Sequence, residues 1–528
     1  MGQRDHSDAI DKEEAAIEAI GGQMVYTDEE TYSASALINR FMDVFTPETM
    51  TFLEQFRARH SPEEIVGYLQ AIRKLKVLVI GETGRRDHWQ LYGYERATTP
   101  RIDAFAAEAT LFERAFSQSS WTKPSMASLL TGHFPTMHQT NLEASILPQS
   151  ETIVTEHLRA QGYRTAVLSG NPWVTPDYGF GRGVDHFFSI YDERFARVTQ
   201  FMRTLKRLSK LMGDRKWVYN RVKLLVQGEL STTTRDEVVA AEAVRWLEQN
   251  RQGPFYMHLQ LMSPHHPYDP PPPFDKFVPD RSVKPMTVYP KKSYFFFEHG
   301  EPLDAKQSAD MIARYDGDIL FADTVFGGLL DKVRGMGLLD DTIVVLTSDH
   351  GEEFYDHQNW GHGQSVYNEL LHVPLIVRDP KAFTPGRRVA TPVMSIDIVP
   401  TLLALVGSPP MPLAAGRNLV DVERQTRSPD AFSELIYKFG AARSVVSGDH
   451  KLVDLQQGER KQARLYDLRG DFGEQHDLAA SNPAQTTQLT QQLGAIHDWA
   501  AGHQSESKSL AVTDEMQQRL KALGYVNP

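Results

Sequence analysis

Residues 119–132 read SSWTKPSMASLLTG, a loop rich in Ser and Thr that runs into an apolar helix. Thr122 stands at the entrance of this predicted helix, and Pro124 lies in the first turn, where proline's missing N–H would have no helical partner. The free N–H groups and the positive dipole end of a first turn can bind a tetrahedral anion. Thr122 is therefore a candidate nucleophile, provided that something lowers its hydroxyl pKa; the alternative is that it only caps the helix.

Apolar runs elsewhere in the chain are predicted to be buried strands, at 76–80, 163–169, 254–261 and 342–347. Polar residues follow each run: Glu82, Asn171, His265 and the pair Asp349-His350. In open α/β sheets, ligands gather just past the carboxyl ends of the strands. These residues are therefore candidates for binding, and the alternatives are a solvated loop carboxylate at Glu82 and histidines with a structural role.

The pair Asp349-His350 is a natural position for metal ligands, because a carboxylate and an imidazole can bind the same ion and Gly351 leaves room for both. His362 lies in the loop that follows. The loop at 263–273 reads SPHHPYDPPPP, and its prolines restrict the backbone around His265, so we expect that histidine to be held in place.

The composition excludes several classes of protein. The 528 residues carry a formal net charge of -12, which argues against general nucleic-acid binding. The chain has no cysteine, so it has neither disulfides nor thiolate metal sites. No apolar run approaches the ~20 residues of a membrane span, and the N-terminus lacks the pattern of a signal peptide. We therefore expect a soluble protein, cytoplasmic by default, although a chain that had lost a targeting segment would look the same.

The sequence divides into three parts. Residues 1–72 are predicted to be a polar helical extension, 73–383 a catalytic core, and 384–528 a C-terminal subdomain with a small antiparallel sheet and a terminal helix ending near Gly524. Residues 190–235 form a basic amphipathic insertion in the core. That insertion is either a lid or surface for anionic substrates or lipid head groups, allowing peripheral membrane contact, or a solvated helical face.

Several motifs in a fixed order resemble the sulfatase family of the alkaline phosphatase superfamily, over about residues 74–480. The segments that carry the resemblance are VLVIGETGRRDHWQLYGYERATTPRID, SQSSWTKPSMASLLTGHFP, LQLMSPHHPYDPPPPF, YDGDILFADTVFGGLLD, LTSDHGEEF with WGHG, and LYDLRGDFGEQHDL. The resemblance implies an α/β fold of the alkaline phosphatase type. Such a fold has a large, mostly parallel central sheet flanked by helices, and a smaller C-terminal antiparallel sheet.

The chain departs from the sulfatase pattern at the nucleophile. Sulfatases convert a Cys or Ser in a Cys-x-Pro-Ser-Arg motif to formylglycine, whereas this chain has Thr122 in that place and Met126 in place of the Arg. Thr cannot become formylglycine. The set Glu82, Thr122, Asp349 and His350 is similar to that of phosphoethanolamine transferases and lipoteichoic acid synthases. Those relatives carry membrane spans that this sequence lacks, and the transferases also carry disulfides.

The resemblance implies a divalent metal bound by Glu82, Thr122, Asp349 and His350. Because an imidazole takes the place of an amide, zinc or manganese suits the set better than calcium, which prefers oxygen ligands. One ion is favoured, and a second is an open alternative. By the same resemblance, His265 and His362 are the catalytic histidines of the substrate site. Lys123 is a further catalytic candidate because it lies beside the nucleophile and could contribute charge, and Arg85 and Asn171 are weaker candidates for the substrate pocket.

The expected activity is that of a metal-dependent hydrolase or transferase acting on a phosphate or phosphonate ester through a covalent phospho-Thr122. One alternative is a sulfatase that works without formylglycine, and another is a non-catalytic binding protein that keeps the fold. The expected substrate is an anionic small-molecule, lipid or sugar ester. The sequence indicates neither the natural substrate nor the oligomeric state.

Overall fold

The computed structural model describes residues 76–190 and 235–510, apart from Thr83, Lys284, residues 287–291, Pro380 and residues 423–429. Of Ile80 and Glu82, only the backbone is described. The predicted extension at 1–72 and nearly all of the predicted insertion at 190–235 lie outside the described residues. The end of the predicted terminal helix, at 511–528, also lies outside them.

The central sheet contains nine strands in the order β11-β2-β10-β7-β1-β6-β4-β5, with β12 pairing to β2. Every neighbouring pair is parallel except the two that β10 makes with β7 and β2. The expectation of a large, mostly parallel sheet is confirmed. Its strands are β1 (Lys76–Glu82), β2 (Thr110–Phe116), β4 (Arg164–Ser169), β5 (His186–Ser189), β6 (Phe255–Gln260), β7 (Thr342–Ser348), β10 (His372–Arg378), β11 (Arg388–Val389) and β12 (Val393–Met394).

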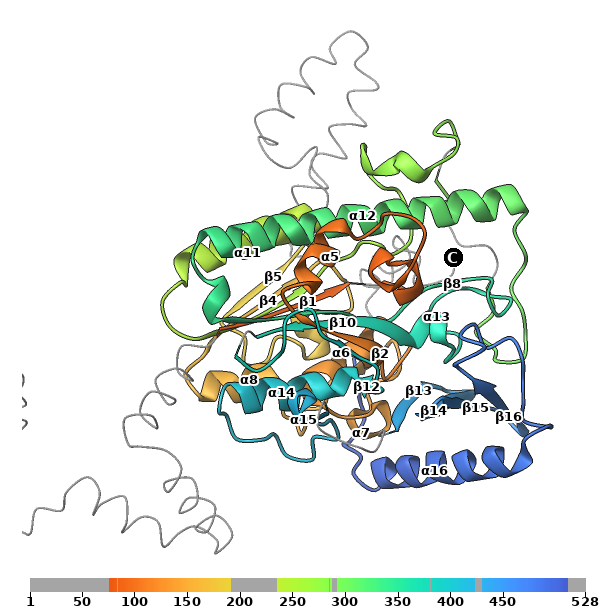
Figure 1. Cartoon of the computed structure of the whole chain (residues 1–528). Coiled ribbons are helices and arrows are strands. Elements are labelled where there is room, and N and C mark those ends of the chain that lie inside the picture. The colour runs from red at the N-terminus through yellow and green to blue at the C-terminus, as the bar shows by residue number, and fades with distance from the viewer. Residues whose placement is uncertain are drawn as a thin grey trace, which may run out of the picture. The chain divides into compact units, whose positions relative to one another are not determined.

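Helices cover both faces of this sheet because its strands bury side chains on both sides. In β1, Val77 and Val79 pack in one core with Met126, while Leu78 packs in the other with Tyr315. Figure 1 shows the two helical layers, one above the sheet and one below it. The first layer contains α5 (Pro100–Ala106), α11 (Arg235–Gln249) and α12 (Ala305–Gly335), and the second contains α6 (Thr122–Thr131), α8 (Val154–Ala160), α14 (Ile398–Leu405) and α15 (Leu419–Val422).

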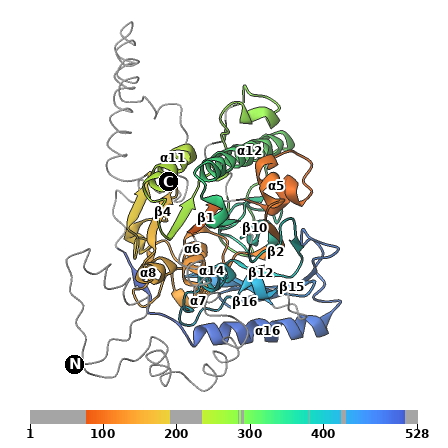
Figure 2. The same ribbon diagram turned by 60° about the vertical axis from the view of Figure 1, so that its left-hand side comes forward.

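The predicted C-terminal antiparallel sheet is confirmed, and a long helix covers one of its faces (Figure 2). Its strands are β13 (Ala431–Tyr437), β14 (Gly440–Ser447), β15 (His450–Gln457) and β16 (Arg460–Asp467). The helix is α16 (Pro483–Ala501), which starts where the Asn482 side chain accepts a hydrogen bond from the backbone N–H of Gln485. Leu489 and Leu493 of α16 pack against this sheet.

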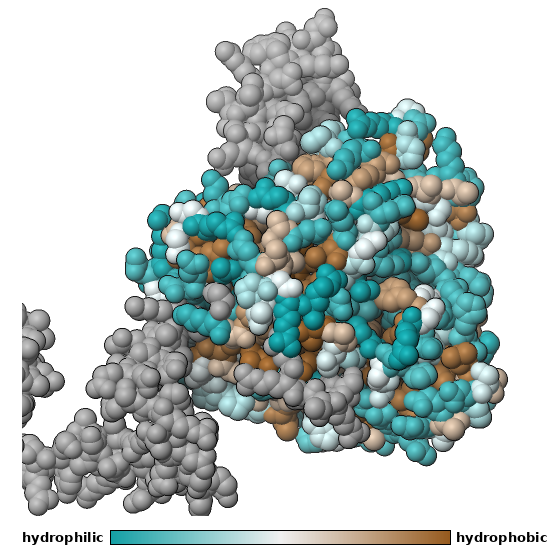
Figure 3. All heavy atoms as spheres, viewed as in Figure 1, coloured by the Kyte–Doolittle hydropathy of each residue, from teal (hydrophilic) through white to brown (hydrophobic). Residues whose placement is uncertain are grey.

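Most of the terminal helix predicted to end near Gly524 lies outside the described residues, and α16 is a separate helix that ends at Ala501. Residues 503–510 are not helical, and β17 (Lys508–Ser509) pairs instead with β3 (Ser145–Ile146) of the core. The remaining short elements are α7 (Pro135–His138), α13 (Asn368–Leu371), β8 (Glu353–Phe354) and β9 (Trp360–Gly361). Within the described ranges, no helix combines the length and the apolar character needed to cross a membrane, and hydrophilic residues are spread over the face seen in Figure 3.

Candidate active site

The segments predicted to carry the site meet at one edge of the central sheet. Strands β1, β7, β6 and β4 are parallel neighbours, with Glu82 opposite Ser348, Gly81 opposite Gln260 and Ser169 also opposite Gln260. The carboxyl ends of these strands therefore lie side by side. The residues that follow them begin next to one another, as expected for a ligand site in an α/β sheet.

Thr122 is the first residue of α6, and Trp121 occupies the N-cap position. The Thr122 hydroxyl oxygen lies 3.2 Å from Nε2 of His350, and it accepts a hydrogen bond of 3.3 Å from the Asn171 amide. Its side chain is fully buried and makes no capping bond to the helix backbone. The alternative that Thr122 only caps the helix is wrong, because its hydroxyl is directed to side chains from two other segments.

His350 presents Nε2 to the site because its other ring nitrogen is engaged. Nδ1 lies 2.8 Å from the carbonyl oxygen of Gly351, which can only accept, so in the neutral ring the proton is on Nδ1. The unprotonated Nε2 then faces Thr122 and lies 3.6 Å from Oδ2 of Asp349. Gly351 is needed at the turn, since a Cβ there would lie 2.0 Å from the carbonyl oxygen of Glu369.

A carboxylate orients His362 beside His350. The two imidazole rings have centroids 4.4 Å apart, and Nδ1 of His362 donates a hydrogen bond of 2.5 Å to Glu352. The other oxygen of Glu352 accepts a 2.6 Å hydrogen bond from the hydroxyl of Tyr268. Burial opposes ionisation of Glu352, but the charge and hydrogen bond of His362 and the bond from Tyr268 outweigh it and hold the pKa of Glu352 below its usual range.

His265 completes the row of imidazoles, with its ring centroid 5.0 Å from that of His362. Its Nδ1 donates a 2.6 Å hydrogen bond to the backbone carbonyl of His266. Burial, together with the neighbouring His362, lowers the pKa of His265 well below its usual range, and burial also lowers the pKa of His362. Both rings are therefore neutral at pH 7. When an anion binds beside them, one of the two rings can take up a proton.

Two predicted site residues are engaged elsewhere. The amine of Lys123 donates a 2.5 Å hydrogen bond to the carbonyl of Glu143 and lies 4.1 Å and 4.8 Å from the ring centroids of Tyr178 and Trp173. Burial lowers its pKa. The guanidinium of Arg85 binds three groups: the carboxylates of Asp87 and Asp356, and the backbone carbonyl of Glu352.

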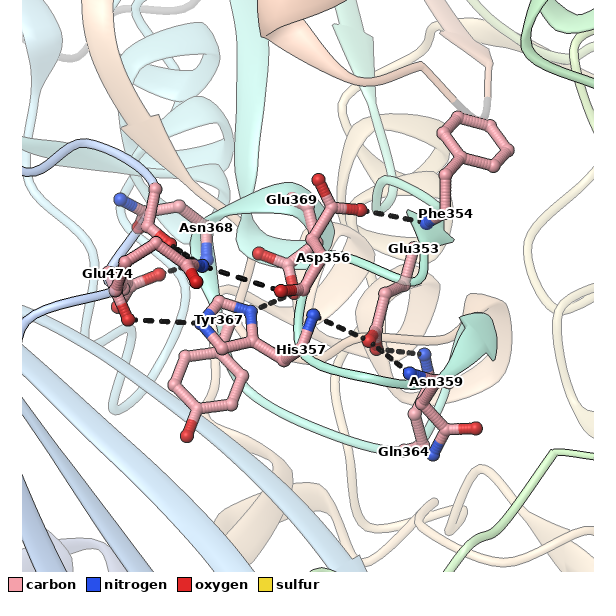
Figure 4. Close-up of polar contacts among 12 residues, drawn as sticks. Glu353, Phe354, Asp356, His357, Asn359, Gln364, Tyr367, Asn368, Glu369 and Glu474 are labelled. Atoms are coloured by element: carbon pink, nitrogen blue, oxygen red, sulfur yellow. Dashed lines mark hydrogen bonds and ion pairs between the residues drawn. The ribbon is translucent and has the colours of Figure 1, made fainter. Parts of the chain in front are cut away.

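A buried polar network supports the loop that carries His362, as Figure 4 shows. Glu353 accepts hydrogen bonds from the backbone N–H groups of His357 and Asn359 and from the Gln364 amide. His357 forms a 2.8 Å ion pair with Glu369 and donates to the carbonyl of Glu474. Because these contacts span 353–369 and reach the C-terminal subdomain, they fix the loop on two sides.

The residues present fit a divalent metal in part. Asp349 and His350 supply a carboxylate and an imidazole next to the Thr122 hydroxyl, a mixed oxygen and nitrogen set that suits zinc or manganese. The Glu82 backbone ends β1 opposite Ser348, the residue before Asp349. Among the described side chains, no three His, Asp or Glu residues are grouped to hold an ion. The metal therefore remains a prediction that requires Glu82.

The sequence prediction missed Glu352 and Tyr268 as members of the site. Both stand in segments already singled out, Glu352 two residues after His350 and Tyr268 three after His265. Their pairing across 84 residues of sequence depends on tertiary structure. In the sequence, only their positions within the motifs pointed to a role. Those positions do not show that one carboxylate accepts hydrogen bonds from both a histidine and a tyrosine.

Comparisons with known proteins find similar sequences and similar solved structures. Arylsulfatase K of Xenopus laevis is 24% identical over 440 residues, covering 76% of this chain and 78% of that protein. The multifunctional alkaline phosphatase superfamily protein PehA of Trinickia caryophylli is 26% identical over 391 residues, covering 65% and 74%. The crystal structure of the phosphonate monoester hydrolase of Agrobacterium radiobacter superimposes with a TM-score of 0.64 at 21% identity, covering 84% of this chain and 98% of that one.

Family models account for most of the described chain. Residues 356–498 match the model of the N-sulphoglucosamine sulphohydrolase C-terminal region. Residues 74–408 match the sulfatase model, and this span holds Thr122, His265, His350 and His362. The chain therefore belongs to the sulfatase family of the alkaline phosphatase superfamily.

Proposed function

We propose that this sulfatase-family protein is a metal-dependent hydrolase or transferase that acts on a phosphate or phosphonate ester, with Thr122 as the nucleophile. The observation that carries the proposal is the contact of the Thr122 hydroxyl with Nε2 of His350 at the N-terminus of α6. A helix start favours a bound anion. Because Nδ1 of His350 is engaged with Gly351, the Nε2 lone pair is placed to bind the same ion as the Thr122 oxygen, and such an ion would favour loss of the hydroxyl proton. A phosphonate monoester hydrolase among the structurally similar proteins supports the same reading.

In the first step, the Thr122 oxygen bonds to phosphorus, its proton passes to solvent, and the bond from phosphorus to the leaving alcohol breaks. The substrate anion favours the protonated form of the neighbouring imidazoles, so His362 or His265 can give the alkoxide its proton. In the second step, water or another alcohol bonds to phosphorus and gives its proton to the same histidine, while the bond from phosphorus to the Thr122 oxygen breaks and that oxygen takes a proton from solvent. Glu352 keeps His362 oriented in both steps.

A divalent ion held by Glu82, Asp349, His350 and the Thr122 oxygen would lower the pKa of the Thr122 hydroxyl and polarise the phosphorus centre. Zinc or manganese suits this set, and one ion is favoured. The Asn171 amide, which donates to the Thr122 oxygen, stabilises negative charge there independently of any ion.

Sulfate ester hydrolysis is the second candidate function, because family membership and the likeness to arylsulfatase K both favour it. Thr122 at the nucleophile position argues against sulfate ester hydrolysis, because threonine cannot form the hydrated aldehyde with which sulfatases expel sulfate. A binding protein without catalysis is the third candidate. Against it stands the retention of Thr122, Asp349 and His350 with the Thr122 hydroxyl oriented by two partners.

The test compares turnover of bis-p-nitrophenyl phosphate and p-nitrophenyl sulfate by protein of measured metal content. Thr122→Ala should abolish phosphodiester turnover, and Thr122→Ser should retain part of it. Thr131→Ala is the matched control, because Thr131 is a buried threonine at the other end of α6 whose hydroxyl bonds two backbone groups, the carbonyl of Ala127 and the N–H of His133. Acid quenching of wild-type protein during turnover should trap phosphate on Thr122, detected by mass spectrometry.

Each outcome separates the candidates. Phosphodiester turnover that survives Thr122→Ala would contradict the nucleophile, and sulfate turnover would favour a sulfatase without formylglycine. Turnover of neither ester by protein that contains metal would favour a transferase with its own acceptor or a binding protein. Trapped phosphothreonine without turnover would distinguish the transferase from the binding protein.

A further inference from the structure

An aromatic cluster lies beside the candidate site and has no part in the chemistry proposed above. We define the aromatic rim as Tyr294, Phe295, Phe296, Tyr437 and Phe439. Its rings are in mutual contact, with centroids 4.8 Å apart for Phe295 and Phe439 and 5.1 Å apart for Tyr437 and Phe439. Phe295 is 42% exposed, which is unusual for a large apolar side chain in the described part of this protein.

The rim is built from two distant parts of the chain. Tyr437 ends β13 and Phe439 lies in the tight turn before β14, and the register places Gly440 beside Gln457, the last residue of β15. The segment 292–297 lies beside these residues, because the backbone N–H of Phe296 donates a 2.9 Å hydrogen bond to the Gln457 side chain. The C-terminal sheet thus holds a half-exposed aromatic surface.

The rim is continuous with the candidate active site. The hydroxyl of Tyr437 donates a hydrogen bond to the carbonyl of Gly363, the residue after His362. A Cβ on Gly363 would lie 3.4 Å from Cβ of Trp121, the residue before Thr122. The amine of Lys292 lies 3.4 Å from the His362 carbonyl. The segment 292–297, which carries the other three rings of the rim, therefore also contacts the loop of His362.

Cations flank the rings. The Lys292 amine lies 4.5 Å from the ring centroid of Tyr294, and the Arg460 guanidinium lies 3.8 Å from the ring centroid of Phe297, the residue next to the rim in sequence. Exposed ring faces with cations at their borders attract a ligand that has a flat apolar face and negative charge. The ester proposed as substrate carries its negative charge on phosphorus, at Thr122, and the rim contacts Gly363 and the carbonyl of His362 beside that position.

We infer that the aromatic rim binds the alcohol side of the ester and selects leaving groups that contain a ring with an apolar face. The inference rests on the proposed function for its placement of the phosphorus centre. A planar aryl ring and the face of a sugar ring share this chemistry, and the test below separates them. A leaving group of simple alkyl type would leave the rim unfilled.

The test measures binding rather than turnover, so it remains informative if the proposed reaction is wrong. Methylphosphonate, phenylphosphonate and a glucosyl C-phosphonate share an anionic head and have no ester bond to break. Isothermal titration calorimetry of the full chain should show that the better ring-bearing ligand binds about tenfold more tightly than methylphosphonate, as expected for contacts with two or more rings. Phenylphosphonate and the glucosyl ligand identify which ring type is preferred.

Two variants locate the effect. Phe295→Ala should reduce the preference for the ring-bearing ligand over methylphosphonate to about threefold. Phe295→Ala combined with Phe439→Ala should nearly abolish this preference, and the affinity for methylphosphonate should be unchanged in both variants. Trp499→Ala is the matched control, because Trp499 is 43% exposed on α16 and packs on Phe134 rather than on the rim. Phe295→Ala alone keeps the test valid if the double variant fails to fold.

Equal binding of all three phosphonates by wild-type protein, or an unchanged preference in Phe295→Ala, would overturn the inference. Failure of the proposed function has a different signature, namely phosphodiester turnover that is absent or insensitive to Thr122→Ala. A ring preference lost in the rim variants alongside absent turnover would support the subsite while rejecting the phosphoryl chemistry.

Discussion

Glu352 is a fully buried carboxylate whose two oxygens serve two partners. One oxygen accepts a hydrogen bond from the proton-bearing nitrogen of His362, and the other accepts a hydrogen bond from the Tyr268 hydroxyl. A carboxylate can accept both bonds, whereas an amide offers one acceptor and one donor. Glu352 therefore fixes which nitrogen of His362 carries the proton, without itself contacting Thr122.

Glu352→Gln should lower kcat/KM about 10- to 100-fold, because the amide N–H group would face either the His362 proton or the Tyr268 hydroxyl. Tyr268→Phe removes only one of the two bonds to the same carboxylate, so its loss should be smaller. The measurement is the pH dependence of kcat/KM for the ester that the wild-type protein turns over. In this pH–rate profile, Glu352→Gln should also shift the limb that reports the titration of His362. Wild-type kcat/KM in Glu352→Gln would rule out the positioning role.

At the scale of elements, the turn after β7 decides where Asp349 and His350 stand. Gly351 passes so close to the Glu369 carbonyl that no side chain fits between them. Its backbone N–H also donates a 2.8 Å hydrogen bond to the carbonyl of Leu370, which ties the turn to α13. The site therefore depends on close packing of two backbone segments.

Gly351→Ala should lower the free energy of unfolding by about 1–3 kcal/mol and reduce activity, because the turn has to move away from Glu369. Gly328→Ala is the matched control within α12. A Cβ at Gly328 would meet no atom within 4 Å, and alanine should stabilise that helix by up to about 1 kcal/mol. Chemical denaturation measures both changes. A Gly351→Ala protein with wild-type stability and turnover would show that the turn tolerates a shift.

At the scale of the whole described fold, a buried charge network joins the core to the C-terminal sheet. Glu474 pairs with Lys451 of β15 at 2.8 Å, and its other oxygen accepts the backbone N–H of Asn368. His357, which pairs with Glu369, also donates to the carbonyl of Glu474. Loss of charge at His357 would therefore weaken contacts on both sides of this interface.

The network predicts how stability depends on pH. Burial alone would lower the pKa of His357, but the charge and hydrogen bond of Glu369 outweigh it and raise the pKa to about 9. The unfolded chain loses this proton near pH ~6.5, so the His357 contribution is complete below that pH and is lost as the pH rises to about 9. We expect the free energy of unfolding to fall by roughly 2–3 kcal/mol over this range.

His357→Gln should be less stable than wild type at pH 6 and should show a flatter dependence up to pH 9, measured by urea denaturation. Glu353, whose pKa burial and the nearby Glu369 raise to about 8, adds a decline of the same sign in both proteins. The difference between the slopes reports the loss of His357 together with its effect on Glu353, whose pKa the charge of His357 lowers. If the free energy of unfolding of the wild type and of the variant fell in parallel with pH, the pH dependence would not come from His357.

The sequence was sufficient for the parts of this fold that follow from local pattern. Parallel buried strands bring their carboxyl ends together, so residues after them, such as Asn171 and His350, could be assigned to one site. Side-chain direction could not be predicted. Lys123 adjoins Thr122 in sequence, yet its amine lies among Tyr178 and Trp173, and Arg85 follows β1 but binds Asp356. Those directions depend on partners that only the tertiary structure supplies.

The central place of β1 has a consequence for biosynthesis. Its neighbours in the sheet are β6 and β7, which begin at residues 255 and 342, so β1 leaves the ribosome long before either partner exists. At the usual rate of synthesis, the wait for β6 is on the order of ten seconds or more. During that time an apolar strand has no sheet to join and is open to aggregation. The nascent chain consequently carries an apolar strand without its sheet partners until its middle third has been made.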